Sequence, residues 1–250
     1  MGPRGSAKQE HCSLFWQTAV MTGTPREQAR ARTMADITRI GRDHLARYGA
    51  AALSLRAVAR DLGMVSSAVY RYVASRDELL TLLLVDGYDA LADAAEAALA
   101  QVPDAAPGER FAALGRAVRA WALAEPATYA LLYGAPVPGY QAPAERTTGP
   151  GTRVARLLLD IAARAYAAGT LSEPEEPAPT PALAAGLEGV REQFDVDLPD
   201  AVLTRGVLVW AALFGCVSFE VFGQYGPDRL GDPDALFERH LAALAADLGV

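Results

Sequence analysis

The chain has 250 residues, of which 51% are hydrophobic, and its 23 basic and 30 acidic residues give a formal net charge of −7. This composition supplies enough apolar side chains for a core, and no uninterrupted apolar run approaches the roughly 20 residues of a membrane-spanning helix. Cys12 and Cys216 are the only cysteines, which excludes a disulfide framework and a cysteine-based zinc site. We therefore expect a soluble, cytoplasmic protein without membrane segment, bound metal or cofactor.

The charge changes sign along the chain. Ten arginines and six acidic residues lie between Met21 and Leu80, whereas eleven arginines and 23 acidic residues lie between Thr81 and Val250. A basic segment joined to an acidic body is typical of a protein that contacts phosphates at one end only. The distribution favours two domains over one in a chain of this length.

Residues 1–25 show no helical or strand periodicity, and we expect a disordered tail there. His11 and Cys12 are neighbours in it, but two potential ligands on such a tail predict no metal site. The first helix is expected from Arg26 to Tyr48, since a proline precedes it and a glycine follows it. Its apolar positions recur at helical spacing and should face inward; they are Met34, Ile37, Gly41, Leu45 and Tyr48.

Two short helices are expected next, within the segment SLRAVARDLGMVSSAVYRYVASR at 54–76. Ser54 is a good N-cap, and Gly63 can adopt the left-handed conformation that ends the first of these helices. The second should run from about Ser66 to Val73, with its two valines facing the core. This is the layout of a helix-turn-helix, whose second helix enters the DNA major groove.

The same segment carries a resemblance to a known family through Ala59, Gly63, the pairs Val69-Tyr70 and Tyr72-Val73, and Arg76 followed by Leu79-Leu80. With these residues the chain resembles the TetR family of transcriptional regulators, whose members carry a three-helix DNA-binding head on a helical body. Val65 departs from the pattern, because many members have Ser or Thr there to cap the recognition helix. The start of this helix is therefore less well defined than in those members.

If the segment binds DNA, as the resemblance implies, eight residues are expected to make the contacts: Arg56, Ser66, Ser67, Ala68, Tyr70, Arg71, Tyr72 and Arg76. The short side chains that open the second helix let its backbone approach base edges. The tyrosine hydroxyls and the arginines can contact phosphate oxygens, which fixes the register on the duplex. Two alternatives stay open: Tyr70 could be a packing residue, and the whole segment could be a structural corner of a helical protein.

A long helix is expected from Ser75, which opens the capping box Ser75-Arg76-Asp77-Glu78. In TetR proteins this helix joins the head to the body, so we interpret it as a lever. Residues 134–151 are rich in Pro and Gly and predict a loop suited to a pocket entrance. The remaining helices are expected at 109–123, at about 126–133, and at 152–168, 182–194, 199–225 and 234–248.

The last two of these helices are strongly apolar, and TetR proteins dimerise through the equivalent pair. The pattern of Trp210, Gly215 and Glu220 resembles the WHG-type ligand domain of one TetR subgroup. A pocket for an apolar effector is expected among the middle helices, with aromatic walls and one carboxylate. Its candidate residues are Phe111, Trp121, Tyr129, Tyr133, Trp210, Phe214 and Glu220, each of which could instead belong to the ordinary core.

The sequence thus predicts an all-α protein with three parts: the tail at 1–25, a helix-turn-helix domain at 26–74, and a ligand-binding and dimerisation domain at 75–250. Its expected function is ligand-responsive regulation, most simply repression, in which a homodimer binds a palindromic operator in double-stranded DNA and a small effector releases it. The competing hypotheses are a helical adaptor whose head binds protein and a helical enzyme. The enzyme hypothesis finds no Gly-rich phosphate loop, no HExxH motif and no nucleophile elbow in the sequence.

Overall fold

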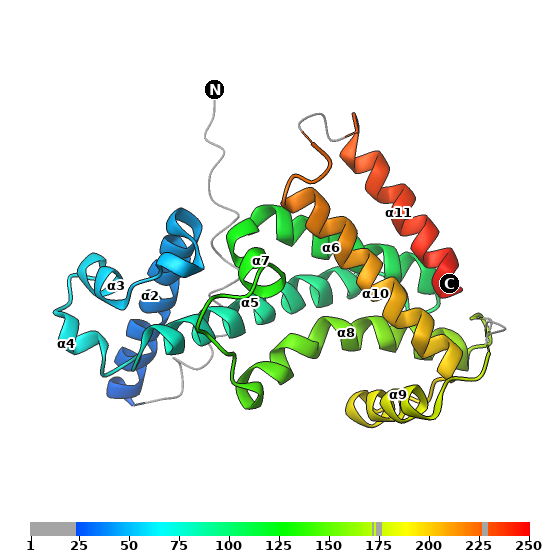
Figure 1. Cartoon of the computed structure of the whole chain (residues 1–250), viewed down its shortest axis with the longest axis horizontal. Coiled ribbons are helices and arrows are strands. Elements are labelled where there is room, and N and C mark those ends of the chain that lie inside the picture. Colours follow the sequence, from blue (N-terminus) through cyan, green and yellow to red (C-terminus); the bar gives the residue numbers. More distant parts are fainter. Residues whose placement is uncertain (1–23, 172, 174–176, 227–229) are drawn as a thin grey trace. The chain divides into compact units, whose positions relative to one another are not determined.

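The computed structural model describes residues 24–171, 173, 177–226 and 230–250, and the regular elements within these ranges are all helical (Figure 1). The expected tail lies almost entirely outside the described residues, as do His11 and Cys12. The elements are α2 (Pro25–Tyr48), the 3₁₀ helix η1 (Ala50–Ala52), α3 (Leu55–Asp61), α4 (Ser66–Val69), α5 (Arg76–Leu99), α6 (Pro107–Ala124), α7 (Pro126–Tyr133), α8 (Ala144–Ala167), α9 (Pro181–Phe194), α10 (Asp200–Val221) and α11 (Pro233–Leu248). The predicted all-α fold is confirmed.

The chain divides into two compact units, each built from segments that are distant in sequence. Unit 1 contains the described residues up to Ala90 together with 127–147, and unit 2 contains 91–126 and the described residues from 148 to 250. Unit 1 therefore holds the helix-turn-helix, the first part of α5, and α7 with the loop that follows it. The head predicted at 26–74 is the N-terminal part of this larger unit, and the assignment of DNA and ligand binding to separate domains stays a prediction.

Helix α2 begins where a local capping signal places it. Thr24 and Glu27 form a capping box, in which the Thr24 amide donates to the Glu27 carboxylate at 2.7 Å. The predicted inward face is buried at its centre, but Tyr48 in the last turn is 60% exposed. The Tyr48 ring instead packs edge-on against His44, with ring centres 5.7 Å apart.

One buried cluster joins the elements of unit 1. Its members come from α2, α3, α4, α5 and the connections between them: Ile37, Ile40, Leu53, Leu55, Val58, Ala59, Val69, Val73, Leu79, Leu80 and Leu83. Leu131 of α7, and Val137 and Tyr140 from the following loop, pack against the same cluster. The segment between α7 and α8 is therefore part of the packing that supports the helix-turn-helix.

The predicted loop at 134–151 is wrong from Ala144 onward, where α8 begins with Pro150 inside it. A proline removes one intrahelical hydrogen bond but leaves the others, so Pro and Gly content alone did not mark the boundary. The Tyr140 hydroxyl lies 2.9 Å from the Thr81 hydroxyl, and the Arg146 guanidinium donates to the Glu78 carboxylate at 2.7 Å. These two contacts tie the segment to the first turns of α5.

Helices α6, α10 and α11 pack together in unit 2 (Figure 1). Gly115 lets α11 approach α6 closely, because a Cβ at this position would overlap a methyl carbon of Leu241. Arg119 of α6 donates two hydrogen bonds to the Glu220 carboxylate of α10, at 2.6 and 2.8 Å, and one to Asp234 at 2.7 Å. Glu220 is only 4% exposed, so this bidentate ion pair connects α6 to α10 from inside the unit, and the contact with the exposed Asp234 adds α11.

Helix α10 is apolar on its exposed side as well as its buried side. An 18-residue window within its 22 residues has a mean hydropathy of 1.8, enough by length and composition alone to cross a membrane, and 39% of that window is buried. Val207, Leu208 and Phe219 are each more than half exposed. This helix therefore presents an apolar surface that a single chain does not cover.

Candidate nucleic-acid interface

Helix α3 forms as the sequence predicts. The Ser54 hydroxyl accepts a hydrogen bond from the Ala57 amide at 3.5 Å, and the inward side chains of the helix are buried. Gly63 follows the helix with a φ of 67°, a left-handed conformation that lets the chain turn toward α4.

Helix α4 is shorter than predicted. It spans Ser66–Val69 instead of 66–73, and residues 70–72 form turns. Val65 is its N-cap and makes no side-chain hydrogen bond, so the first amides of α4 lack the partner that Ser or Thr would supply. Val69 and Val73 are fully buried. Tertiary packing therefore stabilises the recognition segment, residues 66–73, more than its own helical hydrogen bonds do.

Five of the eight predicted DNA contacts lie on the surface of unit 1. They are Arg56 of α3, Ser66 and Ser67 of α4, and Tyr70 and Arg71 directly after it. Their side chains have no hydrogen-bond or ion-pair partner in the part of the chain that the structure describes. Their polar groups are therefore available to an outside partner such as a phosphate oxygen.

The other three predicted contacts, Ala68, Tyr72 and Arg76, are partly buried. The Arg76 guanidinium donates to the carbonyls of Ala50 and Ala51 at 3.0 and 3.3 Å. These hydrogen bonds attach the turn between α2 and α3 to the start of α5. Arg76 thus has a structural role in unit 1, and its interpretation as a phosphate contact gains no support from this geometry.

Arg30 of α2 was not among the residues predicted from the sequence. Its guanidinium carbon lies 5.3 Å from the centre of the Tyr72 ring, and Tyr72 packs against the buried cluster of unit 1. Arg30 is exposed and forms no ion pair with any described acidic residue. It places a positive charge beside the recognition segment. No sequence pattern indicates this contact, because only the fold brings the two residues together.

A buried histidine connects α2 to α3. The His44 Nε2 atom lies 2.7 Å from the Asp61 carboxylate, and the two side chains are 5% and 41% exposed. The hydrogen bond from His44 lowers the pKa of the Asp61 carboxyl, and Arg60 lowers it further. This contact helps to fix the orientation of α3 on α2.

The seven residues predicted to line a ligand pocket are distributed over both units. In unit 1, Tyr129 is fully buried and packs on Tyr133 with ring centres 5.1 Å apart, and burial raises the pKa of the Tyr133 hydroxyl. Tyr133 also contacts Tyr88 of α5 edge-on at 6.1 Å. These rings form a packed aromatic group between α5 and α7.

The other five predicted pocket residues lie in unit 2. Phe111 is buried in the core, Trp121 is partly buried, and Trp210 packs on Phe214 with ring centres 4.3 Å apart. The Glu220 carboxylate is bound by Arg119. Both oxygens of this carboxylate already accept from Arg119, and the role predicted for Glu220 in ligand binding stays a prediction.

Known proteins share both the sequence and the fold of this chain. A sequence profile of the family described as Tetracyclin repressor-like, C-terminal domain, matches residues 111–244. The HTH-type transcriptional regulator Rv1816 of Mycobacterium tuberculosis (strain ATCC 25618 / H37Rv) is 48% identical over 223 residues, which are 89% of this chain and 95% of that protein. The chain belongs to the TetR family of transcriptional regulators. The HTH-type transcriptional regulator Mb1846 of Mycobacterium bovis (strain ATCC BAA-935 / AF2122/97) matches this TetR protein to the same extent.

Solved structures show the same fold. The crystal structure of the regulatory protein SCO4313 is 37% identical, with a TM-score of 0.71, and the match covers 88% of this TetR protein and 98% of that chain. A TetR family transcription regulator from Shewanella sp. PV-4, 16% identical with a TM-score of 0.56 over 85% of this chain and 95% of that one, shares the fold. The predicted family is therefore confirmed. Since TetR proteins are transcriptional regulators, the enzyme hypothesis is excluded.

Proposed function

We propose that this TetR protein is a cytoplasmic repressor that binds a palindromic operator as a homodimer and leaves it when a small effector occupies the protein. One observation carries the proposal. Arg56, Ser66, Ser67, Tyr70 and Arg71 are exposed on a helix-turn-helix and have no partner within the described chain.

Each of these side chains suits one kind of contact with DNA. Ser66 and Ser67 begin α4, so they can meet base edges in the major groove and contribute sequence preference. Arg56, Tyr70 and Arg71 can donate to phosphate oxygens, which strengthens binding to any duplex. Arg30 would also strengthen this sequence-independent binding to phosphates.

A homodimer accounts for the apolar surface of α10. Leu208 and Phe219 lie about three turns apart on one side of the helix and are 59% and 54% exposed. An exposed apolar patch marks a surface for a protein partner or a membrane. Arg205 and the buried Glu220 lie on the same helix and would be costly in hydrocarbon, whereas a second copy offers an identical apolar face. We therefore favour pairing of α10 with its counterpart in a second chain.

Selection of bound duplexes from a random-sequence library tests the function. The full-length protein should enrich a palindrome whose half-sites are about one helical turn apart, with two chains per duplex. The logarithm of affinity should fall linearly with the logarithm of salt concentration, because phosphate contacts release counterions. A folded protein that enriches no sequence and shows no salt-dependent DNA binding would contradict the proposal and favour the adaptor hypothesis.

A further inference from the structure

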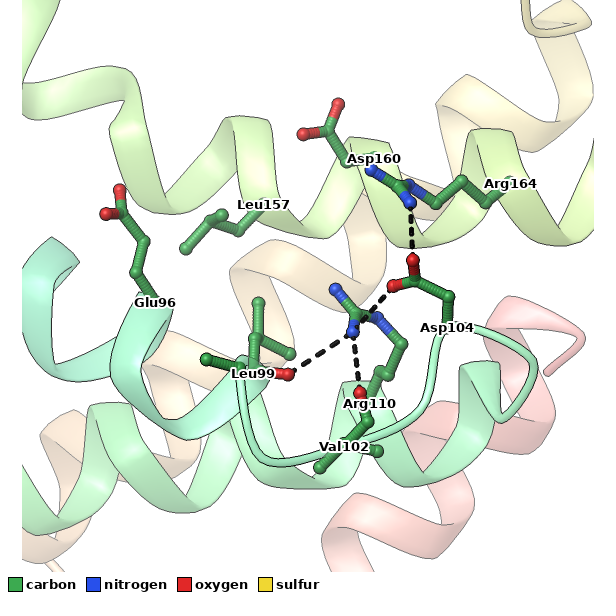
Figure 2. A pocket seen from close by; sticks show the side chains of 9 residues that line it. Glu96, Leu99, Val102, Asp104, Arg110, Leu157, Asp160 and Arg164 are labelled. Carbon is green, nitrogen blue, oxygen red and sulfur yellow. Dashed lines mark hydrogen bonds and ion pairs between the residues drawn. The ribbon is translucent and has the colours of Figure 1, made fainter.

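A hollow in unit 2, between the end of α5, the start of α6, and α8, favours no particular guest (Figure 2). Its volume is about 450 Å³, and charged side chains of both signs line it: Glu96, Asp104, Arg110, Asp160 and Arg164. Figure 2 shows the Asp104 carboxylate between the two arginines, which bind it at 2.9 and 3.0 Å. An anion would meet three carboxylates and a cation would meet two guanidinium groups, so the hollow selects neither.

We infer that Val65 contacts a thymine methyl group in each half-site of the operator and makes the protein prefer thymine there. Val65 directly precedes Ser66 and Ser67 and is 71% exposed, the largest exposed fraction among the large apolar side chains that the structure describes. It was not among the eight DNA contacts predicted from the sequence. The inference rests on the proposed function, because it names a base that the DNA-binding protein selects.

The fold gains little from a valine at position 65. Valine is among the poorest N-cap residues, because it offers no oxygen to the first amides of a helix, and Val65 makes no side-chain hydrogen bond with α4. Its exposed side chain adds little apolar burial either. A single exposed apolar residue is ordinary on a protein surface, but at an N-cap it also gives up the capping hydrogen bond. The Val65 side chain is therefore free to contact a partner outside the protein.

Backbone hydrogen bonds on both sides fix the position of Val65. The Met64 amide donates to the Ala59 carbonyl at 2.9 Å, which closes the end of α3, and the Ala68 amide donates to the Val65 carbonyl at 2.8 Å. Val65 itself has an extended backbone, with φ −66° and ψ 141°, so its side chain does not follow the helical spacing that buries Val69. A β-branched side chain on a fixed backbone has few rotamers to lose on binding.

The side chain of Val65 suits one base better than the other three. In the major groove all four bases present hydrogen-bonding groups, and only thymine adds a methyl group at C5. The two methyl groups of valine can cover this methyl and exclude water from it. Against another base they would displace water from polar atoms without replacing its hydrogen bonds. Val65 therefore favours thymine both through the contact it gains and through the desolvation it avoids.

Deoxyuridine substitution in the selected operator tests the contact, because it removes the thymine methyl and leaves base pairing unchanged. Each selected thymine is replaced in turn, at the symmetric positions of both half-sites, and affinity is measured by fluorescence anisotropy with the full-length protein. At the position that Val65 contacts, the parent should lose about fourfold in affinity per methyl, and therefore about 15-fold for the two half-sites together. A selected palindrome without thymine would overturn the inference.

The variant Val65→Ala identifies the residue that makes the contact. At the position concerned, it should bind the thymine and deoxyuridine operators within about twofold of each other, because the methyl has lost its partner. Arg71→Ala is the control: it should weaken binding to both operators and keep the roughly 15-fold difference between them, since its phosphate contact is independent of the base. A full deoxyuridine penalty in Val65→Ala at every thymine would overturn the inference.

The variant Val65→Thr tests, without DNA, whether the fold needs this valine. Threonine keeps the shape of valine and supplies a hydroxyl that can accept a hydrogen bond from an amide in the first turn of α4. It should raise the melting temperature of the DNA-free protein by about 2–4 °C. A lower melting temperature would show that Val65 supports the fold, and would overturn the inference.

The same experiments separate this inference from the proposed function. If a palindrome is enriched and its methyl penalty is lost in Val65→Ala but kept in Arg71→Ala, both stand. If a palindrome is enriched but Val65→Ala keeps the full penalty, the inference fails and the regulator stands. If the protein enriches no sequence, the proposed function fails and the inference fails with it.

Discussion

Arg71 and Arg76 are close in the sequence but have different surroundings in the structure. Arg71 is exposed and has no partner among the described residues, so it can donate to phosphate. We expect Arg71→Ala to weaken binding to selected and random duplexes by similar factors and to reduce the slope of log affinity against log salt by about one unit. Fluorescence anisotropy at several salt concentrations measures this slope. An unchanged slope would remove Arg71 from the phosphate contacts.

Arg76→Ala is the matched comparison, because Arg76 donates to the carbonyls of Ala50 and Ala51. Loss of these hydrogen bonds should lower the free energy of unfolding by roughly 1–3 kcal/mol. The salt slope of DNA binding should stay close to that of the parent. Urea unfolding and anisotropy measure the two quantities. If Arg76→Ala were as stable as the parent but had a reduced salt slope, Arg76 would be a phosphate contact, as predicted from the sequence.

We expect the His44–Asp61 contact to make the stability of unit 1 depend on pH, because it lowers the pKa of the Asp61 carboxyl. Since the folded pKa of Asp61 lies below its ordinary value of about 3.9, the ionised carboxylate stabilises the fold fully above that value. The stabilisation is lost as the pH falls through the folded pKa. We expect Asp61→Asn to be less stable than the parent near neutral pH and the difference to shrink in acid. Urea unfolding of both proteins, from neutral pH down through the ordinary pKa of aspartate, measures this difference in stability. A difference that does not change with pH would indicate lost packing instead.

At the scale of whole elements, the contact between α5 and α7 in unit 1 depends on Gly87. A Cβ at this position would lie 2.7 Å from the Thr128 methyl and 3.3 Å from a Leu132 methyl. Thr128 is buried and β-branched, so it cannot easily move aside. We expect Gly87→Ala to lower the free energy of unfolding, because overpacking costs roughly 1–3 kcal/mol and alanine recovers only about 1 kcal/mol of helix propensity.

A second substitution checks that the Thr128 methyl is the cause. Thr128→Ser removes this methyl and should restore part of the stability lost in Gly87→Ala. Gly186→Ala in α9 is the control, since nothing lies within 4 Å of its Cβ position, and it should stabilise the protein by about 0.5–1 kcal/mol. Urea unfolding compares the variants. Equal stabilisation by both alanine substitutions would show that α5 and α7 are not in close contact.

At the scale of the whole molecule, the last two helices contain exposed and buried apolar residues, and we expect substitutions at the two kinds to affect assembly differently. Leu208 of α10 is 59% exposed, whereas Leu241 of α11 is 2% exposed and packs at Gly115. We expect Leu208→Glu to give a folded monomer, and Leu241→Glu to unfold, because burying an unpaired carboxylate costs several kcal/mol. Light scattering and circular dichroism distinguish these outcomes. Leu183→Glu on the exposed side of α9 is the control and should remain a dimer.

The sequence by itself determined the helices and the type of head. The Ser54 cap and the left-handed Gly63 act through neighbouring residues, so a local pattern is enough to predict them. The motif between Ser54 and Arg76 also indicated the family, and five of its eight candidate contacts are exposed in the structure. The end of α4 and the start of α8 were missed, because a weak cap and an internal proline do not by themselves mark a boundary.

The partner of each side chain was decided only by the tertiary structure. Arg76 binds the carbonyls at Ala50 and Ala51, Arg30 lies over Tyr72, and Arg119 occupies the carboxylate of Glu220. The hollow at Arg110 is likewise built from three separate segments of unit 2. Hydrogen bonds and ion pairs depend on distances of a few ångströms between residues far apart in the chain. Composition, caps and helical periodicity describe only neighbours along the chain, and they therefore contain no information on these distances.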